Sequence, residues 1–274
     1  MTMRERHLRN AGLVVADDVI VAAYPASGAA LLGNVLRELG HTFVDPHVDE
    51  IGPDGLPHAP ADEKTRHYRS RTTGPSTAVP GARRFFKNHL SPEYFTDIAP
   101  ETVVLLVRDP RDALHSSYRF FQGFAPTLLS YLAIDDVSFP EFLDGKGEVG
   151  EPPITVDGWV DFHRAWLDAA DRAPRSAVVR FEELKTRPAD AMTRLLRTLG
   201  LDADEQSVAR AVERSSFAAM RAREQEVAGE NAPMIMRRGQ VDEWREWFGR
   251  DALSDRFRVP HLVETAARLG YRIN

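Results

Sequence analysis

The amino-acid sequence predicts an α/β fold, with a mostly parallel central sheet that is flanked by helices. Three short apolar runs predict buried strands, at Val19 to Ala23, Val103 to Val107 and Ala177 to Arg180. Helical patterns and crossover-sized segments separate them, as parallel strands require. Continuous apolar runs are typical of strands that are covered on both faces. We therefore expect one domain over residues 1–274, with variable loops at about 41–81 and 122–158.

The first predicted unit is a strand, a tight loop and a helix. The strand Val19 to Ala23 is followed by Tyr24 to Gly28, which breaks the apolar pattern. Gly40 is suited to the end of the helix that follows. The apolar face of this helix is formed by Leu31, Leu32, Val35, Leu36 and Leu39.

The middle of the chain contains long segments that we expect to be mostly irregular. Residues 41–81 are rich in Pro, Gly, Asp and His, and loops of this length are often lids or binding loops. An extended segment resumes at Arg84 to Lys87, before the second strand. Asp109 as N-cap and Pro110 at the first helical position then predict a helix start. Residues 122–157 form a second irregular region with a few aromatic side chains.

The last part of the chain alternates helices with the third strand. Four helices are expected, at Val160 to Ala170, Ala189 to Leu199, Asp204 to Arg214 and His261 to Leu269. In folds of this class, ligands bind outside the carboxyl ends of the strands. Functional residues are therefore expected directly after the predicted strands.

The composition argues against several classes of function. The chain carries 35 Lys and Arg against 41 Asp and Glu, which gives a formal net charge of −6. Nucleic-acid-binding domains are usually basic, so we expect no nucleic-acid partner, while a local basic pocket for one anionic ligand stays open. The absence of cysteine excludes disulfides, thiolate catalysis and zinc–thiolate sites.

The sequence shows no targeting segment. Its N-terminus lacks an apolar signal core, and no apolar run approaches the roughly 20 residues of a membrane span. We therefore expect a cytoplasmic protein without a membrane partner. Arginine supplies 31 of the 35 basic residues, which suggests a GC-rich bacterial genome. The remaining four are Lys64, Lys87, Lys146 and Lys185.

The loop after the first strand is a candidate phosphate cradle. It leads into a helix start, where backbone amides point outward and the helix dipole favours an anion. Ser27 and Gly28 allow the main chain to approach phosphate oxygens. The pattern G-x-x-x-x-G-K-[ST] is absent, so the loop is P-loop-like without being that of an ordinary nucleoside triphosphatase. On its own, a plain turn between strand and helix explains the segment equally well.

The end of the second strand offers a second candidate anion site. Arg108 ends this strand, and Ser116 lies two helical turns further on. A basic side chain and a hydroxyl near a helix N-terminus are able to hold a phosphate group. Taken alone, a surface arginine and a helix-facing serine are the favoured explanation.

Six short motifs follow one another along the chain. They lie at Tyr24 to Leu31, Lys87 to Leu90, Arg108 to Ser116, Phe181 to Leu201, Ser215 to Met220 and Arg237 to Phe248. In this order they resemble the motifs of the sulfotransferases that use 3′-phosphoadenosine 5′-phosphosulfate (PAPS) as donor. Each motif is weak alone, but the ordered set is specific and covers most of the chain.

The resemblance implies sulfuryl transfer from PAPS to a small-molecule hydroxyl, with release of 3′-phosphoadenosine 5′-phosphate (PAP). The first loop would hold the 5′-phosphosulfate, Arg108 and the last motif the 3′-phosphate, and aromatic residues the adenine. The implied nucleotide-binding residues are Ala26, Ser27, Gly28, Ala29, Ala30, Leu31, Arg108, Ser116, Phe181, Ser215, Phe217, Arg237, Arg238 and Gly239. Leu31 and Phe181 replace an aromatic residue and a tyrosine of the family, so contacts to the base should be weaker.

His89 is the expected general base, with Lys87 as a catalytic cation beside it. Imidazole is suited to accept the proton that an attacking hydroxyl loses near neutral pH. The family's loop lysine, which contacts the leaving oxygen, is here Ala26, and two threonines of the same loop are alanines. Loss of one stabilising donor costs on the order of 10²–10³ in rate without compensation. Lys87, Arg237 or an arginine of a closing loop would supply the missing charge.

Three functions stay open at this point. The favoured one is an active sulfotransferase whose cationic support has shifted. The second is a nucleotide- or partner-binding protein on the same scaffold, with impaired chemistry. The third is a fold relative that transfers another group, such as a phosphoryl group, since a fold does not fix a function.

The last motif carries acids where the family has Gly and Asp. These acids are Asp242 and Glu243, and a carboxylate beside the 3′-phosphate site would weaken binding unless Arg237, Arg238 and Arg245 offset it. This segment is expected to fold over the nucleotide.

The acceptor is expected to be an alcohol, phenol or sugar hydroxyl of a small molecule, such as a bacterial natural product. Candidate pocket residues are Phe120, Phe121, Phe124 and Tyr131, of which at least half are expected to be ordinary core. His47, His58 and His67 lack the spacing of a metal site, so no metal is assigned. Family members are often dimers, so the resemblance allows a homodimer, although no stripe in the sequence shows a dimer face.

Overall fold

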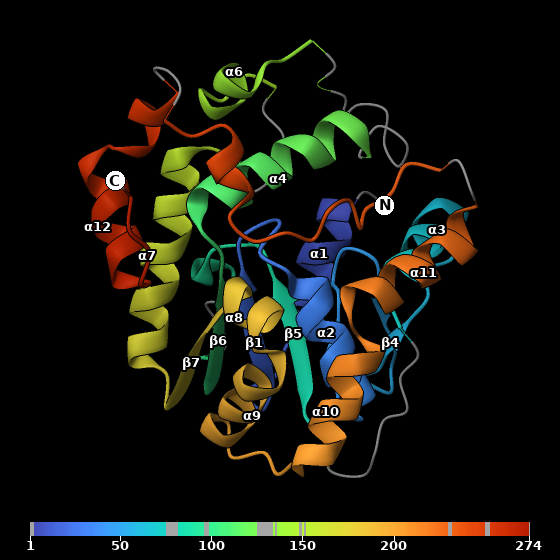
Figure 1. Ribbon diagram of the computed structural model, residues 1–274. Coiled ribbons are helices and arrows are strands. Elements are labelled where there is room, and N and C mark those ends of the chain that lie inside the picture. Colours follow the sequence, from blue (N-terminus) through green and yellow to red (C-terminus); the bar gives the residue numbers. More distant parts are fainter. Residues whose placement is uncertain are drawn as a thin grey trace.

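The central sheet contains five parallel strands in the order β2-β5-β1-β6-β7. They are β1 (Val19–Ala23), β2 (Thr42–Val44), β5 (Arg84–Asn88), β6 (Thr102–Val107) and β7 (Arg175–Arg180). The computed structural model describes residues 3–74, 82–95, 99–124, 134, 136–147, 150, 152–229, 232–249 and 253–273. Figure 1 shows the sheet between two layers of helices, which confirms the predicted fold class.

Alternate residues of β1 face two separate apolar cores. Ile20 and Ala22 pack with α1 (Met3–Ala11), α4 (Pro110–Gly123), α7 (Val156–Arg172) and α12 (Pro260–Arg268). Val19, Val21 and Ala23 pack with α2 (Ala29–Glu38), α8 (Phe181–Thr186), α9 (Pro188–Thr198) and α10 (Glu205–Arg214). Since both faces of the strand are covered, its uninterrupted apolar run is explained.

The carboxyl end of β1 lies where the chain changes direction across the sheet. The chain passes from β1 to the β2 and β5 side, and then crosses to β6 and β7 on the other side. Such a switch point leaves a crevice outside the strand ends. The predicted strands and helices after residue 82 occur as expected, within a few residues at their ends.

The prediction of a mostly irregular segment at residues 41–81 was only partly right, because half of its described residues, 41–74, lie in strands or a helix. The segment contains β2, a hairpin of β3 (Glu50–Ile51) and β4 (Pro57–His58), and α3 (Glu63–Thr72). These strands are too short to show a pattern. Helix α3 carries almost no apolar residues, so it has no stripe to detect, although Asp62 caps it by accepting from the amide of Thr65. Residues 75–81 lie outside the described part.

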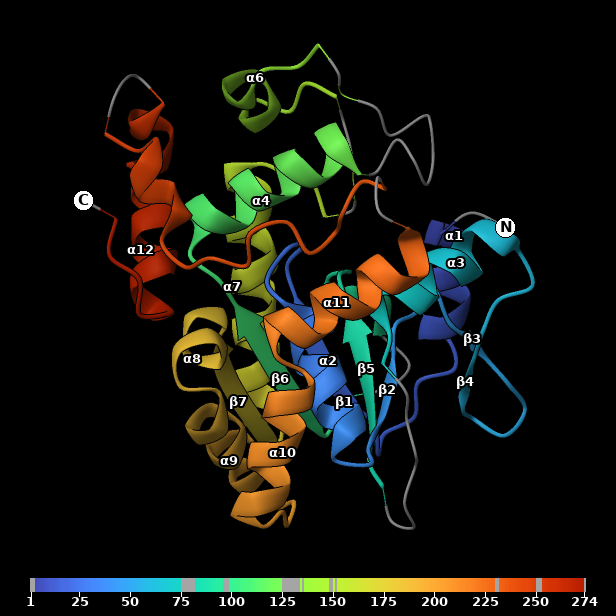
Figure 2. The same cartoon turned by 45° about the vertical axis from the view of Figure 1, so that its right-hand side comes forward.

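Four further helices were not predicted. They are α1, α6 (Phe139–Leu143), which lies in the second segment expected to be irregular, α8, which directly follows β7, and α11 (Phe217–Ala228). Figure 2 shows α11 beside α3, which places two segments that are distant in sequence at one edge of the sheet. Within the described part of the chain, no helix combines the length and apolar character that crossing a membrane requires.

Candidate functional site

A cavity of about 1050 Å³ opens outside the carboxyl ends of β1, β5, β6 and β7. All predicted site residues line it except Ser215. The prediction that Ser215 binds the nucleotide is therefore corrected. Ser215 is only 1% exposed and lies at the C-terminal end of α10, where its amide donates to the carbonyl of Ala211 and its side chain turns inward. The neighbouring Ser216 instead caps α11, so this motif contributes Phe217 to the cavity.

The loop after β1 presents a helix N-terminus without a side-chain cap. Gly28 is the N-cap of α2, with φ of +94°, and Ala26 is also left-handed, with φ of +62°. The hydroxyl of Ser27 is buried and has no hydrogen-bond partner in the described structure. Uncapped amides and an unsatisfied hydroxyl leave donors for an anion, which supports the phosphate-cradle interpretation.

Arg108 joins the loop to the far side of the cavity. Its guanidinium donates to the carbonyl oxygens of Ala26 at 3.0 Å and Gln240 at 3.3 Å, and it lies 4.3 Å from the centre of the Phe181 ring. Burial lowers its pKa, but the side chain stays cationic because an arginine pKa begins far above neutrality. Arg108 therefore brings a buried positive charge beside the loop.

Residues 232–244 form a strap across the cavity, and its first end is held by a buried carboxylate. Glu224 on α11 has no exposed surface and accepts from the amides of Ile235 and Met236, both at 2.7 Å. The same carboxylate accepts from Arg71 of α3 at 2.7 Å. Arg221 adds bonds to the carbonyls of Met236 and Arg237.

The second end of the strap is held by Asp112 of α4. Its carboxylate accepts from the amides of Asp242 and Trp244 at 3.0 and 2.8 Å. Between the two ends, Gly239 lies so close to the ring of Phe217 that a Cβ atom would collide with it. The strap is thus fixed by side chains from α3, α4 and α11.

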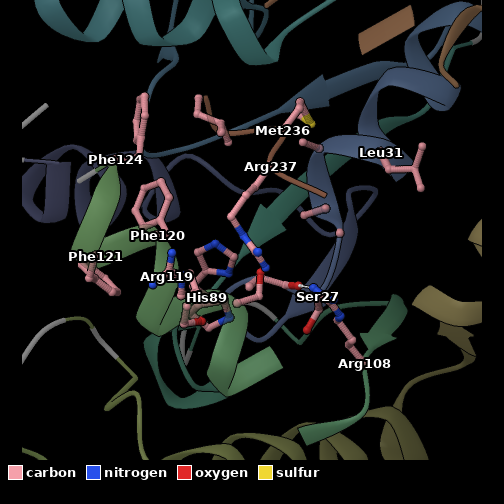
Figure 3. Close-up of a pocket in the computed structure, with 18 of the residues that line it drawn as sticks. Ser27, Leu31, His89, Arg108, Arg119, Phe120, Phe121, Phe124, Met236 and Arg237 are labelled. Carbon is pink, nitrogen blue, oxygen red and sulfur yellow. Dashed lines mark hydrogen bonds between the residues drawn. The ribbon is translucent and has the colours of Figure 1, made fainter. Parts of the chain in front are cut away.

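The arginines of the strap are paired with acids of the same segment. Arg237 donates to both oxygens of Glu243, at 2.6 and 2.7 Å, and Arg238 pairs with Glu246 at 2.8 Å. Figure 3 shows Arg237 extending from the strap into the cavity, where His89 and Ser27 also lie. The positive charges of Arg237 and Arg238 are therefore largely offset by Glu243 and Glu246.

His89 presents one unprotonated nitrogen to the cavity. Its Nδ1 lies 2.5 Å from the carbonyl oxygen of Ala23, which assigns the hydrogen to Nδ1 and the lone pair to Nε2. Burial lowers the pKa of His89 well below its ordinary range, and the charge of Lys87 lowers it further. The neutral ring is therefore the stable form near neutral pH.

Two further histidines, His7 and His47, line the cavity near His89, and neither was predicted to belong to the site. The amide of Asn88 is oriented by its two bonds to Leu90, so its Oδ1 is an acceptor and His7 Nε2 must donate to it across 3.1 Å. His7 Nδ1 then accepts from His47 Nε2 at 3.1 Å. The rings of His47 and His89 are 5.1 Å apart.

Lys87 is held by a carboxylate that no motif indicated. Its Nζ donates to Asp45, just after β2, across 2.8 Å. Both side chains line the cavity, so the positive charge of Lys87 reaches it partly neutralised. Among the residues that the structure describes, no group of His, Asp and Glu side chains is arranged to hold a metal ion.

The rest of the cavity wall is mostly apolar. Phe120 and Phe121 of α4 and Phe124 directly after it line the cavity, as predicted, and Figure 3 shows them along one side. The strap and its neighbours add Met220, Met234, Ile235 and Met236. Tyr131 lies outside the described residues. Lys185 also lines the cavity, although it was not predicted as a site residue. Its position four residues after Phe181 is the sequence signal that places both side chains on the same face of a helix.

The chain is similar in sequence to known proteins over most of its length. A family model described as the sulfotransferase domain matches residues 16–259. Sulfotransferase 6B1 of Danio rerio is 23% identical over 263 residues, which cover 94% of this chain and 82% of that protein. Sulfotransferase 6B1 of Mus musculus is 23% identical over 232 residues, covering 85% and 71%.

Solved structures share the same fold. Mouse sulfotransferase SULT7A1 complexed with PAP has a TM-score of 0.61 at 19% identity, covering 98% of this chain and 93% of that one. Retinol dehydratase in complex with androsterone and the inactive cofactor PAP also has a TM-score of 0.61, at 17% identity, covering 98% and 87%. At these identities the likeness concerns the fold.

Proposed function

This chain belongs to the sulfotransferase family, and we propose that it transfers a sulfuryl group from PAPS to a hydroxyl of an apolar small molecule. The observation that carries the proposal is the convergence of three groups on one cavity. These are the uncapped loop after β1, the buried guanidinium of Arg108 and the Nε2 side of His89.

The residues present fit a nucleotide that carries phosphate at two positions. The unsatisfied hydroxyl of Ser27 and the amides at the start of α2 suit one phosphate group. Arg108 and Ser116 suit the other, with Phe217 beside the base. Gly28 and Gly239 each lie against an aromatic ring with no room for a side chain, so the rings of Phe181 and Phe217, which line the cavity, pack directly on the backbone.

His89 would act as the general base of the reaction. PAPS supplies the sulfuryl group, whose bond to the 5′-phosphate oxygen breaks as the acceptor oxygen bonds to sulfur, leaving PAP. The acceptor O–H bond breaks, and its proton moves to Nε2 of His89. The bond from Nδ1 to Ala23 holds the ring in the tautomer that this transfer needs.

The charge that a loop lysine would bring must come from other residues, because Ala26 carries none. Lys87 is tied to Asp45, and Arg237 is tied to Glu243. Arg237 is the better candidate, since it extends into the cavity and a phosphate group could displace its carboxylate partner. Lys87 would then serve at the acceptor side, next to His89.

The apolar walls favour an acceptor with a hydrophobic body. Phe120, Phe124 and Met236 offer contact area without hydrogen-bonding groups, which suits a phenol or a hydrophobic alcohol better than a sugar. A bacterial natural product with a hydrophobic body and a free hydroxyl would match this apolar wall.

Incubation with ³⁵S-labelled PAPS and a panel of phenols, hydrophobic alcohols and sugars tests the proposal. We expect label on phenols or alcohols, and a loss of kcat on the order of 10²–10⁴ in His89→Asn with the PAP affinity kept. Because the pKa of His89 is lowered, wild-type kcat should hold at pH values below 6.5 before the base is protonated. Absence of transfer to every acceptor would contradict the proposal.

Nucleotide binding without turnover is a second candidate function. The observation that favours it is the neutralisation of Lys87 by Asp45 next to a loop that lacks a cation. Tight binding of PAP in calorimetry, together with no transfer from labelled PAPS, would support it. A rise in melting temperature with ATP and Mg²⁺ but not with PAP would instead indicate transfer of another group.

A further inference from the structure

Lys185 is a cation of the cavity for which neither the motifs nor the chemistry above provides a role. It lies in the last turn of α8, four residues after Phe181, so both side chains project from the same face of this helix. Both line the cavity, and the Lys185 side chain is half-buried. A half-buried ammonium loses part of its hydration and needs a partner to offset that loss.

Two ring–cation pairs line the cavity. The guanidinium of Arg108 lies 4.3 Å from the centre of the Phe181 ring, and Nζ of Lys185 lies 4.8 Å from that of Phe217. Gly28 lies against the Phe181 ring and Gly239 against the Phe217 ring. Each cation thus lies over a ring that packs against a glycine.

Arg108 has an acidic partner, because its guanidinium lies 3.8 Å from the carboxylate of Asp112, whereas Lys185 has none among the described residues. No hydrogen bond or ion pair joins Lys185 to any other residue that the structure describes. Burial lowers the pKa of Lys185, and the charge of Arg108 lowers it further. Two like charges held close together in a cavity repel each other unless an anion lies between them.

We propose that Lys185 is a second cation for the 3′-phosphate of the nucleotide, and that it makes the chain select a 3′-phosphorylated nucleotide over one with a 5′-phosphate alone. This inference rests on the proposed function. The 5′-phosphate is assigned to the uncapped amides at the start of α2, which leaves the Arg108 and Lys185 end for the other phosphate. Phe217 then lies at the base side of Lys185, as the position of the ribose between base and phosphates requires.

Calorimetric titration with PAP and with adenosine 5′-monophosphate tests this role without measuring turnover. In Lys185→Gln we expect the PAP affinity to fall about tenfold, because one charge-assisted contact is lost, while the affinity for the monophosphate changes less than about threefold. Lys185→Arg keeps the charge and should retain most of the PAP affinity. Melting temperatures of the free variants check that they fold.

Lys64→Gln is the matched control, because it removes one charge from an exposed site on α3 outside the cavity. It should bind both nucleotides like the wild type. Equal losses for both nucleotides in Lys185→Gln, or no loss for either, would overturn the inference while wild-type PAP binding upholds the proposed function. A wild-type protein that binds neither nucleotide overturns both.

Discussion

The loop after β1 and the strap both border the end of the cavity that we propose for the nucleotide, but they obtain their shapes from different sources. The loop is shaped by its own backbone: the amide of Ser27 bonds to the carbonyl of Tyr24, and Ala26 and Gly28 take positive φ angles. The strap makes few bonds of this kind. Its ends are held by Glu224 and Asp112, which belong to other helices.

One side of the cavity is therefore shaped by residues that are adjacent in sequence, and the other side by contacts between distant segments. A turn between a buried strand and a helix is encoded by adjacent residues, so it forms wherever that strand and helix form. A strap held by remote carboxylates depends on the correct packing of α3, α4 and α11. We therefore expect that loss of a strap anchor destabilises the packing of the helices that hold the strap. Changes in the loop are expected to act mainly on the proposed nucleotide site next to it.

The largest effect is expected for Glu224→Gln. The amide cannot satisfy Arg71 and the amides of Ile235 and Met236 together, so a buried guanidinium loses its counter-charge. Breaking a buried pair in this way costs about 3–5 kcal/mol. Denaturant unfolding should show that loss, and calorimetry should show a PAP affinity at least about tenfold weaker.

Glu226→Gln is the control for this prediction, because it changes an exposed acid of the same helix. Its unfolding free energy should stay within about 0.5 kcal/mol of the wild type. If both variants lose the same stability, the strap is not held by the Glu224 carboxylate and the contrast with the loop disappears.

An intermediate effect is expected for Gly28→Ala. The added Cβ would lie 2.5 Å from Cδ2 of Phe181, and alanine at φ of +94° is strained. The left-handed backbone alone costs roughly 1–2 kcal/mol, and the overlap with the ring adds to it. We expect a stability loss of about 2–3 kcal/mol and weaker PAP binding, measured by the same two methods.

Gly200→Ala separates backbone strain from the collision. Gly200 lies at the C-terminal end of α9 with a positive φ of +68°, but the nearest atom to the position that its Cβ would take, among the described residues, is Nη1 of Arg175 at 3.5 Å, which is an ordinary contact. It should therefore lose only the strain component and keep its PAP affinity. Equal stability losses at the two glycines would mean that Phe181 gives way, and that the loop is less rigid than its backbone indicates.

The same contrast explains which parts of the site the sequence could predict. The loop, Arg108 and His89 follow predicted strands directly, so their motifs were sufficient to place them in one cavity. His47 and Asp45 lie in a segment that was expected to be irregular, because strands of two or three residues leave no periodic pattern. Tertiary packing alone brings them beside His89.

The other site residues that were not predicted lie on helices without a clear apolar stripe. Arg71 belongs to α3, a helix without an apolar stripe, and Glu224 belongs to α11, whose apolar residues show hardly any preference for one face. His7 lies on α1, which is likewise poor in apolar residues. In each case the helix is fixed by contacts with distant segments, and those contacts leave no local signal in the sequence.

The smallest effect, and the only one expected to strengthen binding, is that of Glu243→Gln. Glu243 holds Arg237 with two bonds and lies 3.8 Å from His115, so a phosphate group must compete with this carboxylate for the arginine. Because Arg237 is one-third exposed, screening keeps the effect small, and we expect PAP to bind about two- to fivefold more tightly. Glu246→Gln, which removes one of the two acidic partners of the more exposed Arg238, should change the affinity less. Weaker binding in Glu243→Gln would show instead that this acid positions Arg237 for the nucleotide, as the remote acids position the strap.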